Sequence, residues 1–268
     1  MVTLLDGAIG TGLWEKAKEK VPVWRYNVEA PEIVAELHRE YDEAGAEILL
    51  ANTFGANRIA MEGTGYTVER VVRPALDIAH SATKKRIALS IGPLSKLLEP
   101  FGELSEDEAR DIFREQIGAG MAGKPDIIFV QTFMDIEMAK IAVSEADRFD
   151  VPVFCCMSFD KNGRTMMGNS VDDVIDGLSK LRVDAVGLNC SLGPDLALPV
   201  IREFTEKTDM PVVFKPNAGK PTASGAEFDT ETFAEDAAKA AEFGVRYIGG
   251  CCGTNASYIR KLAEKLGR

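Results

Sequence analysis

The chain has 268 residues, of which 46% are hydrophobic and 27% are charged. This composition is typical of a soluble globular protein, and the length suits a single domain over residues 1–268. Because the formal net charge is −11 and no Lys/Arg-rich run is present, we expect no nucleic-acid partner.

The sequence also indicates the compartment. No apolar stretch approaches the ~20 residues that span a bilayer, and the N-terminus MVTLLDGAIG lacks the charged segment and cleavage site of a secretion signal. We therefore expect a cytoplasmic protein without membrane contact. In that reducing setting, the five cysteines favour metal binding or catalysis over disulfides.

Short apolar runs of strand-like composition alternate with helical patterns along the whole chain. The predicted strands, in order, are Leu4–Ile9, Ala46–Phe54, Arg86–Gly92, Asp126–Phe133, Pro152–Phe159, Ala185–Ser191, Pro211–Ala218 and Tyr247–Cys252.

The segments between these runs have apolar residues at helical spacing, as in PEIVAELHREYDEAGA, EDEARDIFREQIGAGM and ETFAEDAAKAAEFG. Capping and stop signals support these helices. They are the capping-box pairs Ser105 with Glu108 and Thr232 with Glu235, and the terminating glycines Gly45 and Gly244.

Continuous apolar strands joined by helices predict a parallel sheet that helices cover on the outside. Eight such units, in a chain of this length, predict an α/β fold consisting of a single (β/α)8 TIM barrel. An open doubly wound sheet is the alternative, because the sequence does not show whether the eighth strand pairs with the first.

In barrels of this kind, reactive groups gather at the carboxyl ends of the strands. Cysteines occur at two of these ends, with Cys190 closing the sixth predicted strand and Cys251 and Cys252 closing the eighth. Both strands belong to the same alternate set around the barrel, so we expect the three sulfurs to converge. Other polar residues at strand ends are candidate substrate contacts, namely Asp6, Asn52, Gln131 and Asn189.

Adjacent residues of an extended strand point to opposite faces, so Cys251 and Cys252 reach one point only if the backbone leaves the β conformation. The glycines of GGCCGT permit that departure. Three thiolates with an open fourth position are the pattern of a reactive zinc site. A disulfide between Cys251 and Cys252, or simple packing, are the alternatives.

Cys155 and Cys156 lie in VFCCMSF, among bulky residues and without glycine. We expect ordinary alternation there, with one thiol facing the barrel interior and the other the helices, as buried hydrophobic residues. The two histidines, His38 and His80, lie in helical segments away from strand ends and are interpreted as packing or surface residues.

Seven segments in order resemble the homocysteine S-methyltransferase domain, and together they cover nearly the whole chain. The segments are DGAIGTGL, ANTFGAN, SIGPLSKLLEPFGELS, SFDKNGRTMMGNS, VGLNCSLGP, KPNAGKP and GGCCGT. The similarity is strongest to the homocysteine-binding module of cobalamin-dependent methionine synthase and weaker to betaine-homocysteine methyltransferase.

This resemblance implies a Zn²⁺ ion bound by Cys190, Cys251 and Cys252, with the homocysteine sulfur entering as the fourth ligand. Asn217 of the PNAG motif resembles the residue that holds this fourth position before the substrate arrives. The loop of Asp6, Gly7 and Ala8 resembles the part that contacts the polar end of the amino acid.

The implied chemistry follows from charge. A free thiol has a pKa of about 8.5, whereas coordination to zinc stabilises the thiolate. The bound sulfur is then nucleophilic at neutral pH and attacks a methyl group, giving methionine if the thiol is homocysteine.

The sequence departs from the family at two positions that concern the acceptor. Gln131 stands where the family commonly has a glutamate that binds the substrate ammonium, and Lys215 stands where the synthase module often has glutamine. A neutral amide attracts an ammonium less strongly than a carboxylate does, although Asp135 lies close by in sequence. An ammonium from Lys215 near the mouth would favour an anionic group on the ligand, and another small thiol is the alternative acceptor.

The chain ends shortly after GGCCGT, so we expect the methyl donor to come from a separate molecule. A methyl-corrinoid protein carrying methylcobalamin is the expected partner, and a small sulfonium or ammonium compound is the alternative donor. A zinc-thiolate barrel that binds a metabolite without turnover remains the non-enzymatic alternative.

Overall fold

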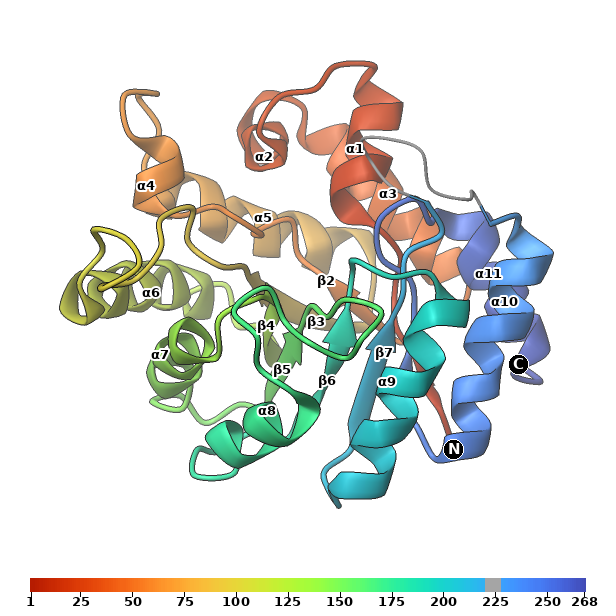
Figure 1. The fold of residues 1–268 in the computed structure, drawn as a ribbon. Coiled ribbons are helices and arrows are strands. Elements are labelled where there is room, and N and C mark those ends of the chain that lie inside the picture. The colour runs from red at the N-terminus through yellow and green to blue at the C-terminus, as the bar shows by residue number, and fades with distance from the viewer. Residues whose placement is uncertain (220–227) are drawn as a thin grey trace.

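The computed structural model describes residues 1–219 and 228–268, and it places a ring of helices around a central set of strands (Figure 1). The strands are β1 (Thr3–Leu4), β2 (Ile48–Leu50), β3 (Arg86–Ile91), β4 (Ile127–Phe133), β5 (Val153–Met157), β6 (Ala185–Asn189), β7 (Val212–Lys215) and β8 (Tyr247–Ile248).

Helices fill the connections between successive strands. They are α1 (Ile9–Ala17), η1 (Val23–Arg25), α2 (Tyr26–Glu29), α3 (Pro31–Glu43), α4 (Arg58–Met61), α5 (Val68–Ala82), α6 (Glu106–Met121), α7 (Ile136–Ala146), α8 (Val171–Leu178), α9 (Pro194–Lys207), α10 (Thr230–Ala238), η2 (Lys239–Phe243) and α11 (Ala256–Lys265). None of the helices in the described part of the chain has the length and apolar character needed to cross a bilayer.

The sheet closes on itself. All pairs are parallel, in the order β1-β8-β7-β6-β5-β4-β3-β2, and a parallel bridge between Leu5 and Ile48 joins the two outer strands of this order. Backbone hydrogen bonds from Glu47 to Leu4 (2.8 Å) and from Asp6 to Ile48 (3.2 Å) complete the junction. The predicted (β/α)8 barrel is confirmed, and the open doubly wound sheet is excluded.

Every predicted strand is present, but most are shorter than predicted at their carboxyl ends. Asp6, Gly7 and Ala8 form a loop after β1, and Ile9 already begins α1. β8 ends at Ile248, so Cys251 and Cys252 lie in the turn that follows it. The apolar runs continue past the last ladder pair because the loops at this end of the barrel are themselves buried.

The core has an inner and an outer layer. Strand residues and Leu5, which follows β1, fill the inner cluster, which includes Cys156, whereas Cys155 belongs to the larger cluster between the strands and the helices. Both thiols are fully buried, and burial raises the pKa of Cys155 to about 12. The predicted alternation of this pair is confirmed.

Three of the four predicted helix signals are correct. Ser105 and Glu108 form a capping box at the start of α6, and the φ values of Gly45 (98°) and Gly244 (89°) are left-handed where helices end. The capping box predicted for Thr232 and Glu235 is wrong. α10 begins earlier, at Thr230, because the Asp229 carboxylate accepts a hydrogen bond from the Thr232 amide.

His38 of α3 is fully buried, and neither ring nitrogen has a hydrogen-bond partner among the described residues. Burial lowers its pKa from 6.5 to about 4. The ring therefore stays neutral in the folded protein at pH values where the unfolded chain protonates it.

We expect His38→Leu to reduce the acid sensitivity of folding. Above pH 6.5, His38 is neutral in both the folded and the unfolded state. As the pH falls from 6.5 towards 4, the unfolded chain binds a proton that the folded protein does not, and the free energy of unfolding falls by about 3 kcal/mol. Between pH 7 and pH 4, the free energy of unfolding measured with urea should therefore fall by about 3 kcal/mol less in the variant than in the wild-type protein. His80→Gln is the control, and equal losses in wild type and His38→Leu would contradict the assignment.

Candidate functional site

The three predicted cysteines meet at the carboxyl end of the barrel. The sulfur atoms of Cys190, Cys251 and Cys252 all lie within 4.8 Å of one another, and the Cys190 and Cys252 sulfurs are 3.7 Å apart. Cys190 follows β6, and the other two follow β8. The predicted convergence is confirmed, and all three side chains are partly exposed.

The glycines around Cys251 and Cys252 act differently from one another. Only Gly253 has a left-handed φ, at 83°. Gly249 and Gly250 are needed for close approach, because an added Cβ would lie 2.7 Å from the Asp6 carbonyl oxygen or 2.5 Å from Thr254 Oγ1, respectively. Of the three glycines expected to permit special dihedrals, only Gly253 therefore adopts a left-handed φ, whereas Gly249 and Gly250 each exclude a larger side chain by close approach.

The backbone at the end of β6 is also unusual. Cys190 and Ser191 both adopt left-handed φ values, at 62° and 58°, although neither is glycine. This conformation costs residues with a Cβ about 1 kcal/mol or more. The Ser191 hydroxyl donates a hydrogen bond to the Phe159 carbonyl oxygen (2.7 Å). This bond helps to stabilise the turn that positions the Cys190 sulfur.

The three neighbouring cysteines favour the ionisation of one thiol and disfavour the ionisation of the other two. Hydrogen bonds with Cys251 and Cys252 lower the pKa of Cys190 to about 3, whereas the hydrogen bonds with Cys190 raise the pKa of Cys251 and take that of Cys252 to about 12. Three thiolates in contact repel one another, so the ionisation of all three requires a cation between them.

The residues present fit a divalent metal ion. Thiolate sulfurs are preferred ligands of Zn²⁺, and three of them leave one position of a tetrahedron open. Asn217 Oδ1 is buried and has no hydrogen-bond partner among the described residues, while the Asn217 side chain also interacts with Cys190. An orphaned oxygen beside three sulfurs is a suitable donor for the open position.

A cavity of about 420 Å³ opens beside the cysteines and is lined by all three of them. Of the predicted substrate contacts, Gly7, Ala8, Asn52 and Gln131 line it. Asp6 and Asn189 do not line it, since they lie behind its wall. Sequence reasoning missed the apolar part of the wall, which includes Trp14, Val23, Leu50 and Phe54.

Asp6 is engaged in a buried ion pair. Its Oδ1 lies 2.5 Å from Lys215 Nζ, and its Oδ2 accepts a hydrogen bond from the Leu50 amide (2.7 Å). β1 and β7 both adjoin β8, so the side chains after β1 and at the end of β7 can meet. Burial raises the pKa of Asp6, although Lys215 opposes this shift. The expected free ammonium of Lys215 at the mouth is therefore wrong, because Asp6 neutralises it.

Asn189 connects the cavity wall to the cysteines. Its Nδ2 lies 2.7 Å from Thr132 Oγ1, 3.3 Å from Gln131 Oε1 and 3.8 Å from the Cys251 sulfur. Its Oδ1 accepts the Thr132 amide hydrogen (2.7 Å), where a bulge in β4 gives Thr132 a left-handed φ of 66°. This bulge lets the adjacent Gln131 and Thr132 both face the cavity.

We expect Asn189→Leu to weaken metal binding by about 10- to 100-fold, because it removes the N–H donor to the Cys251 sulfur and its support of Thr132. Competition between the protein and a chromophoric chelator measures this change. Cys155→Ala, which alters a thiol outside the site, should leave the affinity unchanged. An Asn189→Leu affinity equal to that of wild type would contradict a role for this hydrogen bond.

Thr254 is a further site residue that sequence reasoning missed. Its Oγ1 accepts a hydrogen bond from the Ala8 amide (3.1 Å) and donates one to the Cys251 carbonyl oxygen (2.8 Å). The residue thereby joins the loop after β1 to the cysteine turn. Thr254 belongs to the GGCCGT motif, but the sequence does not show that it contacts Ala8, which lies 246 residues away.

Asp135 is not available to the cavity. It caps α7, where its carboxylate accepts a hydrogen bond from the Glu137 amide (2.9 Å), and it does not line the cavity. The last two residues of the KPNAGKP segment lie outside the described residues.

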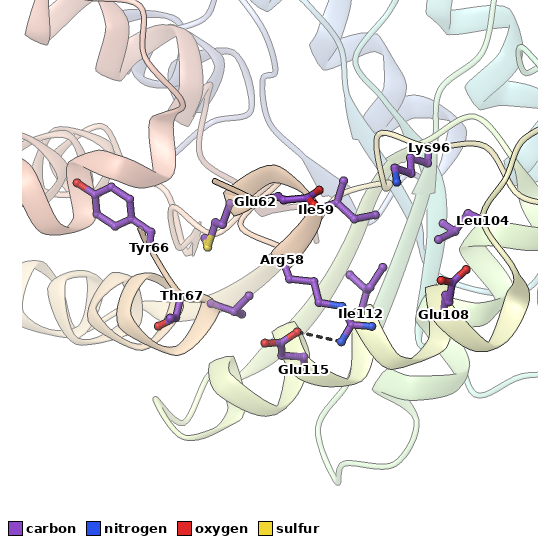
Figure 2. Close-up of a pocket in the computed structure, with 12 residues that line it drawn as sticks. Arg58, Ile59, Glu62, Tyr66, Thr67, Lys96, Leu104, Glu108, Ile112 and Glu115 are labelled. Atoms are coloured by element: carbon purple, nitrogen blue, oxygen red, sulfur yellow. Dashed lines mark hydrogen bonds and ion pairs between the residues drawn. The ribbon is translucent and has the colours of Figure 1, made fainter. Parts of the chain in front are cut away.

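Two other hollows adjoin the barrel rim. One of about 720 Å³ is lined by Asn217, Met166 and Ser191, the residue that follows Cys190 in the chain. The other, of about 470 Å³, lies between α4 and α6 (Figure 2). It contains the exposed Arg58–Glu115 ion pair (3.3 Å) and no predicted site residue, so its charges are interpreted as a solvated surface.

Two relatives match nearly the whole chain. Methionine synthase of Mycobacterium leprae (strain TN) is 30% identical over 300 residues, and that of Mycobacterium tuberculosis (strain ATCC 25618 / H37Rv) is 31% identical over 295 residues. These alignments cover 98% and 97% of this chain, but the chain spans only 24% of each relative.

Among solved structures, the homocysteine methyltransferase MmuM from Escherichia coli is similar in its metallated form (TM-score 0.83) and its oxidised form (0.85). Each match covers 98% of this chain and 96% of the other, at 20% identity, and supports the fold. A family model described as homocysteine S-methyltransferase matches residues 3–266. The chain therefore belongs to the homocysteine S-methyltransferase family.

Proposed function

We propose that residues 1–268 act as one domain that transfers a methyl group to the sulfur of a small thiol, with zinc held by Cys190, Cys251 and Cys252. The observation that carries this proposal is the meeting of three thiols beside an open cavity of about 420 Å³. The family description and the names of the relatives make L-homocysteine, with methionine as product, the first acceptor to test.

Zinc in this thiol cluster would supply the positive charge that keeps an acceptor thiol deprotonated near neutral pH. The chain contributes position and exclusion of water. Asn217 offers its Oδ1, which has no hydrogen-bond partner among the described residues, to the open position, and Asn189 orients the Cys251 sulfur. Gly7 and Ala8 form the wall that faces the rest of the acceptor, with Asn52 and Gln131.

The transfer itself is a displacement at carbon. A lone pair of the acceptor sulfur forms the new S–CH₃ bond, and the bond between the methyl group and the donor breaks. The donor leaves with that electron pair, and the thiol proton passes to solvent. The residues that align the acceptor sulfur with the methyl group therefore contribute more to the rate of transfer than any proton-transfer group.

We propose that the donor approaches through the hollow of about 720 Å³, because it is lined by Asn217 and by Ser191, the residue next to Cys190. Met166 and Leu196 line it and are 66% and 49% exposed. Exposed apolar side chains beside a reactive centre support docking of a methyl-corrinoid protein. A small sulfonium donor is the second candidate, supported by Phe228 and Asp195 in the same hollow, which suit a cation.

A single-turnover experiment tests the proposal. The zinc-loaded protein is mixed with methylcobalamin or a methylsulfonium compound and with L-homocysteine, and the methylated thiol is detected by mass spectrometry. Methylated product that depends on Cys190, Cys251 and Cys252 supports the proposal, and the donor that yields it identifies the donor class. Bound zinc and bound thiol without product from either donor would favour a binding protein instead.

A further inference from the structure

In the acceptor cavity, the hollow of about 420 Å³ beside the cysteines, two segments of the wall are tied to each other. They are the β1 loop, residues 6–8, and the cysteine turn, residues 249–254. The Gly250 amide donates a hydrogen bond to the Asp6 carbonyl oxygen (3.0 Å), and the Ala8 amide donates one to Thr254 Oγ1 (3.1 Å). The position of the β1 loop is therefore coupled to that of the cysteine turn.

The β1 loop leads directly into the start of α1. Ala8 is the N-cap residue of this helix and makes no side-chain capping hydrogen bond. The first amides of a helix have no partner inside the helix and carry a partial positive charge. Ile9, Gly10 and Thr11 belong to this first turn and line the acceptor cavity. The start of α1 therefore suits the carboxylate of the proposed α-amino acid acceptor.

Tyr41 of α3 contacts both segments from behind. Its side chain is fully buried, and its hydroxyl donates a hydrogen bond to the Ala8 carbonyl oxygen (2.8 Å) and lies 3.4 Å from the Thr254 carbonyl oxygen. In a trans peptide the C=O and N–H groups point in opposite directions. By holding the Ala8 carbonyl, Tyr41 therefore also fixes the direction of the Ile9 N–H. Tyr41 is not among the described residues that line the cavity, so it acts through the loop.

Gly7 shows how closely these groups fit together. An added Cβ at this position would lie 2.7 Å from both the Tyr41 hydroxyl oxygen and Thr254 Oγ1. Such a contact is too short for a Cβ atom, so a larger residue would displace the loop from Tyr41 or from the cysteine turn. The backbone of the loop, the Tyr41 hydroxyl and Thr254 therefore pack without free space between them.

We propose that Tyr41 is a positioning residue for the acceptor. Its hydroxyl holds the start of α1 against the cysteine turn, so that the amides facing the acceptor carboxylate stand at a fixed distance from the cysteine sulfurs. The inference rests on the proposed S-methyl transfer and adds to it a residue of α3. The cysteine turn has a separate anchor, since the Cys251 amide donates to the Pro216 carbonyl oxygen (2.8 Å). Loss of the Tyr41 hydroxyl should therefore affect acceptor binding more than zinc binding or transfer.

Tyr41→Phe, which removes only the hydroxyl, tests the proposal on zinc-loaded protein. With the donor that supports turnover by the wild type, we expect KM for L-homocysteine to rise at least about fivefold, while kcat changes less than about twofold. Calorimetry without a donor should show the same loss of affinity, and metal analysis should show an unchanged zinc content. Tyr26→Phe is the matched control and should leave KM unchanged. Tyr26 is also buried, and its hydroxyl donates to the Glu19 carbonyl oxygen (2.7 Å), outside the cavity wall.

Gly7→Ala tests the same contact from the side of the loop and decides the question if Tyr41→Phe does not fold. It should also raise KM while zinc is retained. Gly118→Ala in α6, where an added Cβ meets nothing within 4 Å, should not. An unchanged KM in Tyr41→Phe and Gly7→Ala, or a loss of kcat or zinc at unchanged KM, would overturn the inference. Absence of thiol methylation by the wild-type protein would instead overturn the proposed function itself.

Discussion

Replacing Cys252 with alanine is expected to lower zinc affinity at least about a hundredfold and to abolish methyl transfer, while the barrel remains folded. Loss of a direct ligand should exceed the ~10- to 100-fold effect typical of residues that only support ligands. The fold should survive because the three cysteines are partly exposed at the barrel rim, outside both core clusters. Metal analysis and circular dichroism measure the two properties on the same sample.

Cys155→Ala is the matched control for this prediction. It makes the same substitution in the same barrel, but Cys155 is fully buried between strand and helices and lies outside the cluster. This variant should lose about 1 kcal/mol of stability and keep its zinc. Retention of zinc in Cys252→Ala would contradict its role as a ligand, and unfolding of that variant would show that the metal is structural.

The second large effect is expected at the Asp6–Lys215 pair. Asp6→Asn or Lys215→Met leaves one buried charge without a partner, so each should lower the free energy of unfolding by about 3–5 kcal/mol. The double variant should lose less than the sum of the two, because no lone charge remains. Urea unfolding at pH 7 measures all three.

Lys207→Met is the control for this pair. Lys207 contacts Asp172 (2.6 Å) and Glu203 (2.8 Å), but all three side chains are exposed by about a third or more. Its loss should cost no more than about 1 kcal/mol. Equal and small losses for Lys215→Met and Lys207→Met would show that the buried pair does not stabilise the fold.

The sequence predicted the architecture well because the barrel repeats one local pattern. Each strand is apolar on both faces, and each helix has an amphipathic period, so their number and order are readable without long-range information. The convergence of Cys190 with Cys251 and Cys252 followed from topology alone, since the carboxyl ends of parallel strands meet at one rim.

The features that escaped prediction depend on contacts between distant segments. The Asp6–Lys215 pair joins residues 209 positions apart, and the Ala8–Thr254 bond joins residues 246 apart. Thr132 in the bulge and Cys190 in its turn adopt left-handed φ values although neither is glycine, and no local sequence pattern predicts this. These same features set the charge and shape of the cavity, so the sequence predicted the metal centre better than the acceptor.

X-ray absorption at the zinc edge tests the central claim most directly. Zinc-loaded protein should show three sulfur neighbours at about 2.3 Å together with one oxygen or nitrogen neighbour, and addition of the acceptor thiol should change this to four sulfurs. A protein that binds no zinc, or a spectrum that the thiol leaves unchanged, would contradict the account.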